Sequence, residues 1–126
     1  KEISKISSKK EITTNILLEV NVGKEESKSG IFLEGLNDLI AEVSEMENIK
    51  IKGLMTIPPI CDSEAEVSKY FESMYQTFID IKNKKIDNVD MDILSMGMSH
   101  DYEAAVKNGS NIVRVGSAIF GARKYF

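Results

Sequence analysis

Four short strand-like segments, each followed by a helix-like segment, constrain the fold of this chain more than any other feature. The strand-like segments are residues 15–22, 49–57, 91–94 and 111–115, and helical periodicity follows at residues 32–46, 63–81, 100–108 and 117–120. Strands that alternate with helices imply parallel strands joined by right-handed crossovers. Two architectures satisfy this order: a small open α/β sheet and a segment of a TIM barrel.

The spacing of apolar residues supports both kinds of element. Residues 49–57 (IKIKGLMTI) alternate apolar and polar residues until Pro58 and Pro59 end the strand. The first two helical segments carry apolar stripes at spacings of three and four, made by Phe32, Leu36, Leu39, Ile40, Val43 and Met46 and by Val67, Tyr70, Phe71, Met74, Phe78 and Ile81. The chain therefore predicts amphipathic helices that pack on strands.

Capping signals place the ends of several helices. Ser63 and Glu66 have the spacing of a capping box. Ser99 is a favourable N-cap for a helix from residue 100, and Gly109 predicts its end in the left-handed conformation. Residues 1–10 are typical either of the frayed end of a helix that begins outside the chain or of a disordered N-terminus.

Polar residues within the predicted strands favour the barrel over the open sheet. Glu19, Asn21 and Arg114 lie where a doubly wound sheet buries aliphatic side chains. The interior of a barrel tolerates polar groups near its C-terminal mouth, where TIM-barrel sites lie. Half a barrel leaves both outer strands with open edges, which natural proteins seldom leave uncovered. We expect a second half, or self-association through the open barrel edges, to cover them.

Composition excludes several classes of protein. The net charge of −4 argues against a nucleic-acid-binding surface, which usually needs a basic patch. No apolar run reaches the roughly 20 residues that span a bilayer, so no membrane segment is expected. The one cysteine, Cys61, cannot form an internal disulfide and favours a cytoplasmic protein. His100 is the one histidine, so neither a Ser/His catalytic site nor a multi-histidine metal site is expected.

Two strand-to-helix junctions carry the residues most suited to bind an anion. The first is Ser95–Ser99 (SMGMS), and the second is Gly116–Ser117, directly after the last strand. A helix N-terminus offers free N–H groups and a partial positive charge, serine hydroxyls add donors, and glycine allows close approach of the backbone. In TIM barrels a phosphate site commonly lies in the loops after the last two strands. The pair of junctions therefore predicts a phosphate site.

Arg114 has two interpretations. Strand alternation places it on the same face as Ile112 and Gly116, among β-branched neighbours where an unpaired charge is costly. One interpretation is a structural salt bridge with a carboxylate such as Asp92 or Asp101. The other is a cation held against a bound ligand.

The segment LSMGMSHDYEAAVKNGSNIVRVGSAIFGAR (94–123) resembles the signature of the pyridoxal phosphate homeostasis proteins, the YggS/PROSC family. LLEVNVGKEESKSG (17–30), GLMTIPP (53–59) and the helix face at 71–74 agree with that family in order and spacing. The resemblance covers nearly everything after residue 14. It implies the C-terminal half of a (β/α)8 barrel of the alanine racemase N-terminal domain type, with about four parallel strands.

The family resemblance also implies a site and a cofactor. It implies that one molecule of pyridoxal 5′-phosphate lies at the C-terminal ends of the strands, with Arg114 facing the pyridine nitrogen. The residues implied in binding the cofactor phosphate are Ser95, Met96, Gly97, Ser99, Gly116 and Ser117. A permanent cation beside the pyridine nitrogen disfavours its protonation and weakens the ring as an electron sink. The resemblance accordingly implies a carrier or regulator of the cofactor, with no catalytic residue and no metal.

The sequence departs from the family in one respect. Family members carry the Schiff-base lysine on the first strand of the barrel, and no segment of residues 1–126 resembles that strand. We therefore expect a single partial barrel domain that lacks the cofactor lysine. Its cofactor binding should be weak or absent, and phosphate or sulfate should be able to occupy the site. The alternative is a fragment of a pyridoxal-phosphate-dependent racemase or decarboxylase barrel, which would need a further catalytic domain.

Overall fold

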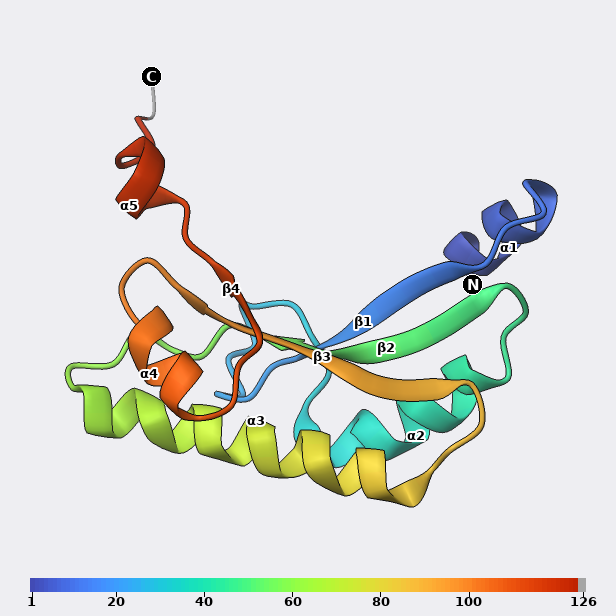
Figure 1. The fold of residues 1–126 in the computed structure, drawn as a ribbon, viewed down its shortest axis with the longest axis horizontal. Helices are drawn as coiled ribbons and strands as arrows, with labels where there is room; N and C mark the ends of the chain where they lie inside the picture. The colour runs from blue at the N-terminus through green and yellow to red at the C-terminus, as the bar shows by residue number, and fades with distance from the viewer. Residues whose placement is uncertain (125–126) are drawn as a thin grey trace.

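Helices and strands alternate along the whole of residues 1–124, the part of the chain that the computed structural model describes (Figure 1). The elements are α1 (Glu2–Lys9), β1 (Thr14–Val20), α2 (Leu33–Ser44), β2 (Ile49–Thr56), α3 (Glu64–Lys84), β3 (Val89–Met98), α4 (Tyr102–Lys107), β4 (Ile112–Arg114) and α5 (Ser117–Phe120). The four strands form one sheet, and each neighbouring pair is parallel. The predicted α/β class with four parallel strands is confirmed.

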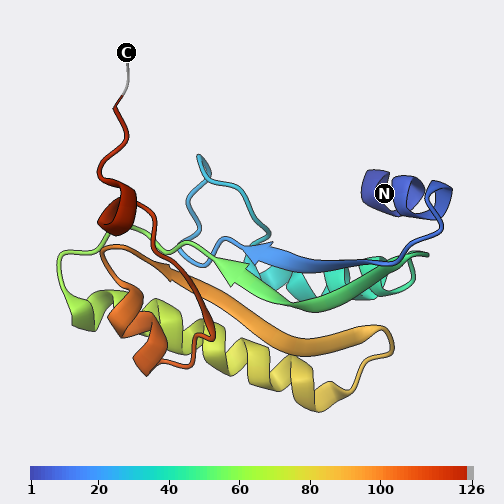
Figure 2. The same cartoon turned by 45° about the horizontal axis from the view of Figure 1, so that its top comes forward.

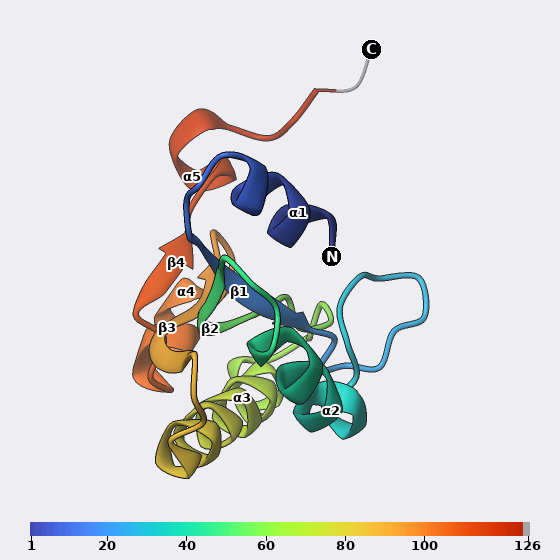
Figure 3. The same ribbon diagram turned by 90° about the vertical axis from the view of Figure 1, so that its right-hand side faces the viewer.

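The strand order distinguishes between the two predicted architectures. The strands lie in the order β1-β2-β3-β4, so each strand pairs with its neighbour in sequence. Helices α2, α3 and α4 all lie on one face of this sheet (Figures 1 and 3). A doubly wound sheet reverses its order and carries helices on both faces, whereas a barrel advances in one direction with its helices outside. The arrangement is that of consecutive units of a barrel.

The hydrophobic core lies between the sheet and α2, α3 and α4. Alternate residues of β2, such as Ile49 and Ile51, are buried against the helices, while Lys50 and Lys52 lie on the opposite face. The helices contribute their predicted stripes: Leu36, Ile40 and Val43 from α2 and Val67, Phe71, Met74, Phe78 and Ile81 from α3 are buried. Core packing on one face therefore leaves the other face of the sheet for polar groups.

Most predicted helix ends are confirmed, and one is wrong. Ser63 is the N-cap of α3, and its side chain accepts a hydrogen bond from the Glu66 N–H. Gly109 follows α4 with φ of 99°. The prediction that Ser99 caps α4 is wrong, because α4 begins at Tyr102 with Asp101 as its N-cap residue. The Asp101 carboxylate accepts the Met98 N–H at 2.7 Å, which closes a turn before the helix starts.

Strand β3 is longer than residues 91–94. It runs through Val89–Met98, so most of the SMGMS segment is strand and not the predicted junction. Ser110 explains part of this extension, because its hydroxyl donates to the Met96 carbonyl at 2.6 Å and also lies within hydrogen-bonding distance of the Leu94 and Ile112 carbonyls. A side chain outside the strand thus holds the β3 backbone in place.

Helix α1 confirms the helical prediction for residues 1–10 and lies at the end of the molecule opposite α5 (Figure 1). The Ser7 and Thr14 hydroxyls share a hydrogen bond of 2.6 Å, and Ser8 donates to Asn48. None of the helices within residues 1–124 has the length and apolarity needed to cross a membrane.

Candidate functional site

The carboxyl ends of the four strands meet at one edge of the sheet, because all the strands are parallel. The β1–α2 loop, the residues after β2, the β3–α4 turn and α5 all lie toward this edge (Figure 2). In open and closed parallel sheets this edge is where ligands bind. We call it the mouth.

Arg114 at the end of β4 reaches across the mouth to β2. Its guanidinium Nη2 donates to the Thr56 carbonyl at 2.8 Å, over three strands of the sheet. Its Nε–H is buried and has no hydrogen-bond partner. Burial lowers the pKa of Arg114, and the negative charges of Asp101 and Glu19 oppose that shift. Arginine nevertheless keeps its charge at neutral pH.

The structure does not show the salt bridge that one interpretation of Arg114 predicted. Among the ion pairs of residues 1–124, none joins Arg114 to Asp92 or Asp101. Asp92 pairs with Lys52 at 2.8 Å, and Asp101 bonds the Met98 N–H. Arg114 is therefore a partly buried cation that donates to a backbone carbonyl. Its buried Nε–H has no hydrogen-bond partner.

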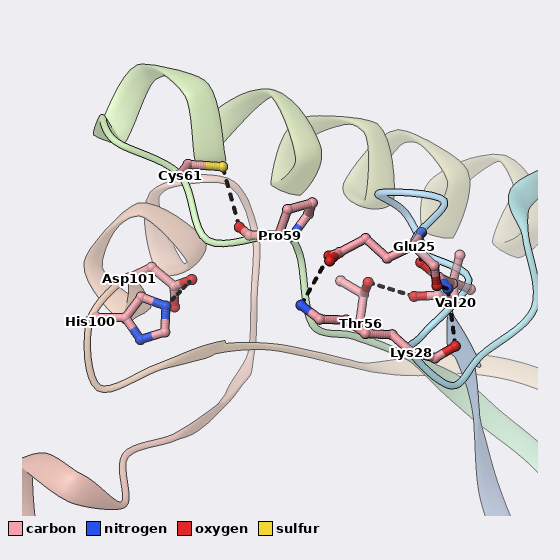
Figure 4. A network of polar contacts seen from close by, with 9 residues as sticks. Val20, Glu25, Lys28, Thr56, Pro59, Cys61, His100 and Asp101 are labelled. Carbon is pink, nitrogen blue, oxygen red and sulfur yellow. Dashed lines mark hydrogen bonds and ion pairs between the residues drawn. The ribbon is translucent and has the colours of Figure 1, made fainter. Parts of the chain in front are cut away.

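Thr56 holds this arrangement together, and sequence reasoning missed it. The side chain is fully buried, and its hydroxyl donates to the Val20 carbonyl at 2.6 Å (Figure 4). Thr56 thereby connects the ends of β1 and β2 while its carbonyl receives Arg114. A hydroxyl near the end of the strand predicted at residues 49–57 was the one available signal.

The two predicted junctions meet in space. The Ala118 N–H, at the start of α5, donates to the Ser99 hydroxyl oxygen at 3.0 Å. Two separate hollows, of about 390 and 510 Å³, share Ser99 and His100, and the larger is lined by Met98, Ser99, His100, Arg114, Gly116, Ser117, Phe120, Gly121, Ala122 and Arg123. Four of the predicted residues, Ser99, Arg114, Gly116 and Ser117, are thus brought together. Phe120 and Arg123 line the same hollow and were not predicted.

The other three predicted residues lie behind the mouth, within β3. Ser95 and Met96 are buried, and Met96 belongs to the core between sheet and helices. A Cβ on Gly97 would lie 2.7 Å from the Ala105 Cβ, so this glycine permits close packing of α4. None of the three is among the residues that line the larger hollow.

The β1–α2 loop forms a wall of the mouth that a buried amide holds in place. Asn21 is 4% exposed; its amide donates to the Glu25 carbonyl at 2.6 Å and its oxygen accepts the Glu25 N–H at 3.0 Å. The Lys28 ammonium pairs with the Glu25 carboxylate at 3.0 Å, close to Thr56 (Figure 4). One buried amide therefore fixes the loop backbone.

Cys61 and His100 line the smaller hollow. Burial raises the pKa of the Cys61 thiol, with the carboxylates of Glu66 and Asp62 adding to the shift, so the thiolate form is disfavoured. His100 pairs with Asp101 at 3.4 Å and its side chain is 62% exposed. Within the described part of the chain, no group of three or more His, Cys, Asp or Glu residues could hold a metal ion.

Comparison with known proteins places this geometry in a family. The model of the family described as alanine racemase, N-terminal domain, matches residues 1–124. A pyridoxal phosphate homeostasis protein of Aquifex aeolicus is 43% identical over 98% of this chain and 54% of its own length. A protein of the same name from Escherichia coli is 43% identical over 88% of the chain and 46% of its own length. The chain thus spans about half the length of the curated relatives it matches.

Solved structures agree on the fold. PipY of Synechococcus elongatus, solved with pyridoxal phosphate bound, is 25% identical with a TM-score of 0.80, over 94% of this chain and 54% of that one. Alanine racemase of Clostridium difficile is 19% identical with a TM-score of 0.63, over 98% of this chain and 33% of that one, and shows the fold alone. The likeness therefore extends to barrels that are larger than the four strands described above.

Proposed function

The chain belongs to the alanine racemase N-terminal domain family, and from this premise we propose that it forms the phosphate- and pyridine-contacting side of a pyridoxal 5′-phosphate site. We propose further that the site serves cofactor binding and homeostasis and not catalysis. The observation that carries the proposal is the convergence of Ser99, Ser117 and Arg114 on one hollow at the mouth. The names of the relatives and the cofactor bound to PipY support it.

The residues present fit the cofactor in size and in chemistry. The larger hollow, about 510 Å³, is of the size that small-molecule sites commonly have. The buried Nε–H of Arg114 lacks an acceptor, and a ligand atom could supply one. The Ser99 oxygen accepts the Ala118 N–H at the position where a phosphate oxygen would compete for it. A phosphate dianion would accept from that N–H and from both serine hydroxyls.

Pyridoxal phosphate, when bound, supplies an aldehyde and an electron-withdrawing ring. Arg114 would face the ring nitrogen as a permanent cation, so the nitrogen stays unprotonated. Such a ring withdraws electrons weakly, which suits storage and transfer of the cofactor better than carbanion chemistry. No lysine lines the larger hollow within residues 1–124, so binding by this chain is held by the phosphate and by Arg114 without a covalent bond.

The test measures binding of pyridoxal phosphate and of inorganic phosphate to the 126-residue chain. Calorimetry gives the affinity, and the change in melting temperature gives a second measure of binding. Arg114→Met should weaken binding of pyridoxal phosphate about tenfold or more, since hydrogen bonds to charged groups contribute roughly 1.5–3 kcal/mol. Lys107→Met is the matched control: it removes a cation that pairs with Glu64 on the surface, and it should leave binding unchanged.

Two outcomes would contradict the proposal. Equal affinity of the Arg114→Met variant and the parent chain would show that the cofactor binds elsewhere. A stoichiometric mass increase after borohydride reduction would show that a lysine within residues 1–126 anchors the cofactor, and the non-covalent mode would then be wrong.

A further inference from the structure

Thr56 is a buried residue at the mouth that does not line the larger hollow. It is the last residue of β2, and its side chain is fully buried. Its hydroxyl donates to the Val20 carbonyl at 2.6 Å, and the two residues are also paired in register across β1 and β2 (Figure 4). A side chain buried in this way can influence a ligand in that hollow only through another residue.

The sequence after Thr56 explains why a side-chain hydroxyl makes this bond. Residues 58 and 59 are both proline, which has no N–H and cannot extend a backbone ladder. The Thr56 hydroxyl therefore ties β2 to β1 at the point where the backbone ladder stops. Because threonine is branched at Cβ, its side chain has few rotamers, and a bond from its hydroxyl also fixes its backbone. The Thr56 carbonyl is held in place as a result.

That carbonyl is the anchor of Arg114. Within residues 1–124 the Thr56 carbonyl is the one hydrogen-bond acceptor of the Arg114 side chain, 2.8 Å from Nη2, and the buried Nε–H has no partner. A mobile arginine side chain carries about 2 kcal/mol of rotamer entropy, which binding must overcome. An anchor at Nη2 removes much of this cost before a ligand arrives, and it leaves the Nε–H free to donate to the ligand.

Two carboxylates compete with the anchor for the guanidinium. The negative charges of Asp101 and Glu19 act on Arg114 and favour its charged form. Among the ion pairs of residues 1–124, neither carboxylate is joined to Arg114. An arginine released from the Thr56 carbonyl would turn toward one of these carboxylates, because charge-assisted hydrogen bonds are stronger than those to a neutral acceptor. The anchor therefore decides where the cation points.

We propose that the Thr56 hydroxyl is a positioning group that directs Arg114 at the pyridine ring, and that it thereby makes the mouth select pyridoxal phosphate over a bare phosphate. The inference rests on the proposed function, since it assigns the ring end of the ligand to Arg114. The phosphate end is assigned to Ser99 and Ser117, and neither is hydrogen-bonded to Thr56. The two ends of the ligand therefore depend on different residues and can be measured separately.

The experiment compares the affinities of the 126-residue chain for pyridoxal phosphate and for inorganic phosphate, measured by calorimetry, with circular dichroism to verify folding. Thr56→Val keeps the shape and the backbone carbonyl and removes the hydroxyl. It should weaken pyridoxal phosphate about fivefold, the scale of one hydrogen bond, and change the affinity for inorganic phosphate by less than about twofold. Thr56→Ser restores a hydroxyl and should restore the selectivity. Thr56→Ala serves the same comparison should the valine variant fail to fold.

Thr77→Val is the matched control. The Thr77 hydroxyl also donates to a backbone carbonyl, that of Ser73 at 2.9 Å, but it lies on α3 and outside the larger hollow. Its removal should leave both affinities unchanged. Equal weakening of both ligands by Thr56→Val would mean that Thr56 supports the mouth as a whole, and the inference would be wrong. Failure of Thr56→Ser to restore the selectivity would contradict it as well.

Arg114→Met separates this inference from the proposed function. If Thr56 acts through Arg114, adding Thr56→Val to Arg114→Met should bring no further loss of pyridoxal phosphate affinity. A loss in Arg114→Met with none in Thr56→Val overturns the inference alone. No loss in Arg114→Met overturns the proposed function, and the inference with it.

Discussion

Gly53 is the glycine at which an added Cβ would meet its neighbours at the shortest distance. A Cβ at this position would lie 1.8 Å from the Ile93 carbonyl oxygen on the adjacent strand, and the β2–β3 register shifts between Ile51 and Gly53. Gly53→Ala should therefore force β2 and β3 apart and lower the free energy of unfolding by about 3 kcal/mol, the upper end for overpacked sites. Urea unfolding measures the loss.

Gly116→Ala is the matched control for Gly53→Ala. A Cβ at Gly116 would meet no atom within 4 Å, so the free energy of unfolding should change by less than about 0.5 kcal/mol. Equal losses in the two variants would mean that chain flexibility, and not the contact with Ile93, determines the effect.

At the scale of residues, the sequence predicted several of the groups that lie at the mouth. It did not predict which atoms each of these groups contacts. Ser99, Arg114, Gly116 and Ser117 meet because each follows or ends a parallel strand, a consequence of strand order alone. The Thr56 carbonyl as the partner of Arg114 could not be predicted, because it comes from a strand two positions away in the sheet. Side-chain partners that depend on sheet curvature are not encoded in local spacing.

At the scale of elements, the strand and helix order was predictable and several boundaries were not. The apolar stripe of α3 predicts its buried face because periodicity is a local property. The extent of β3 depends on Ser110 and Asn111, which bond its backbone from 14 to 19 residues away in sequence. Helix α4 begins after Asp101 and not after Ser99, and the Asp101 carboxylate accepts the Met98 N–H in the turn before the helix without capping it.

Two ion pairs between β2 and β3, Lys50 with Asp90 and Lys52 with Asp92, should make stability depend on pH, and we call these four residues the ladder. The ammonium of Lys50, followed by that of Lys52, holds the pKa of Asp90 below its ordinary value of 3.8. A carboxyl with a lowered pKa adds stability above its ordinary value and loses that stability as pH falls through the lower, folded value. Asp92 and Asp90 raise the pKa of Lys52 above its ordinary 10.5, so the contribution from Lys52 is present below 10.5 and is lost as pH rises through the folded value.

Asp90→Asn tests the acid side of this dependence. From about pH 6 to about pH 3 the variant should lose less stability than the parent chain, measured as the urea midpoint, because it no longer has this carboxyl to protonate. The difference should shrink at high salt, since these charges are exposed and screened. Asp38→Asn, an exposed carboxylate on α2, is the control, and an equal effect there would show that the ladder is not responsible.

At the scale of the whole molecule, the central strands and the edges should differ in their rate of amide exchange. β2 and β3 lie inside the sheet, and their core residues Ile51, Leu54 and Leu94 are fully buried. α5 and the residues around it are exposed, so their amides open without global unfolding. We expect β2 and β3 to exchange slowest, β1 and β4 at intermediate rates, and α5 fastest, as measured by hydrogen–deuterium exchange.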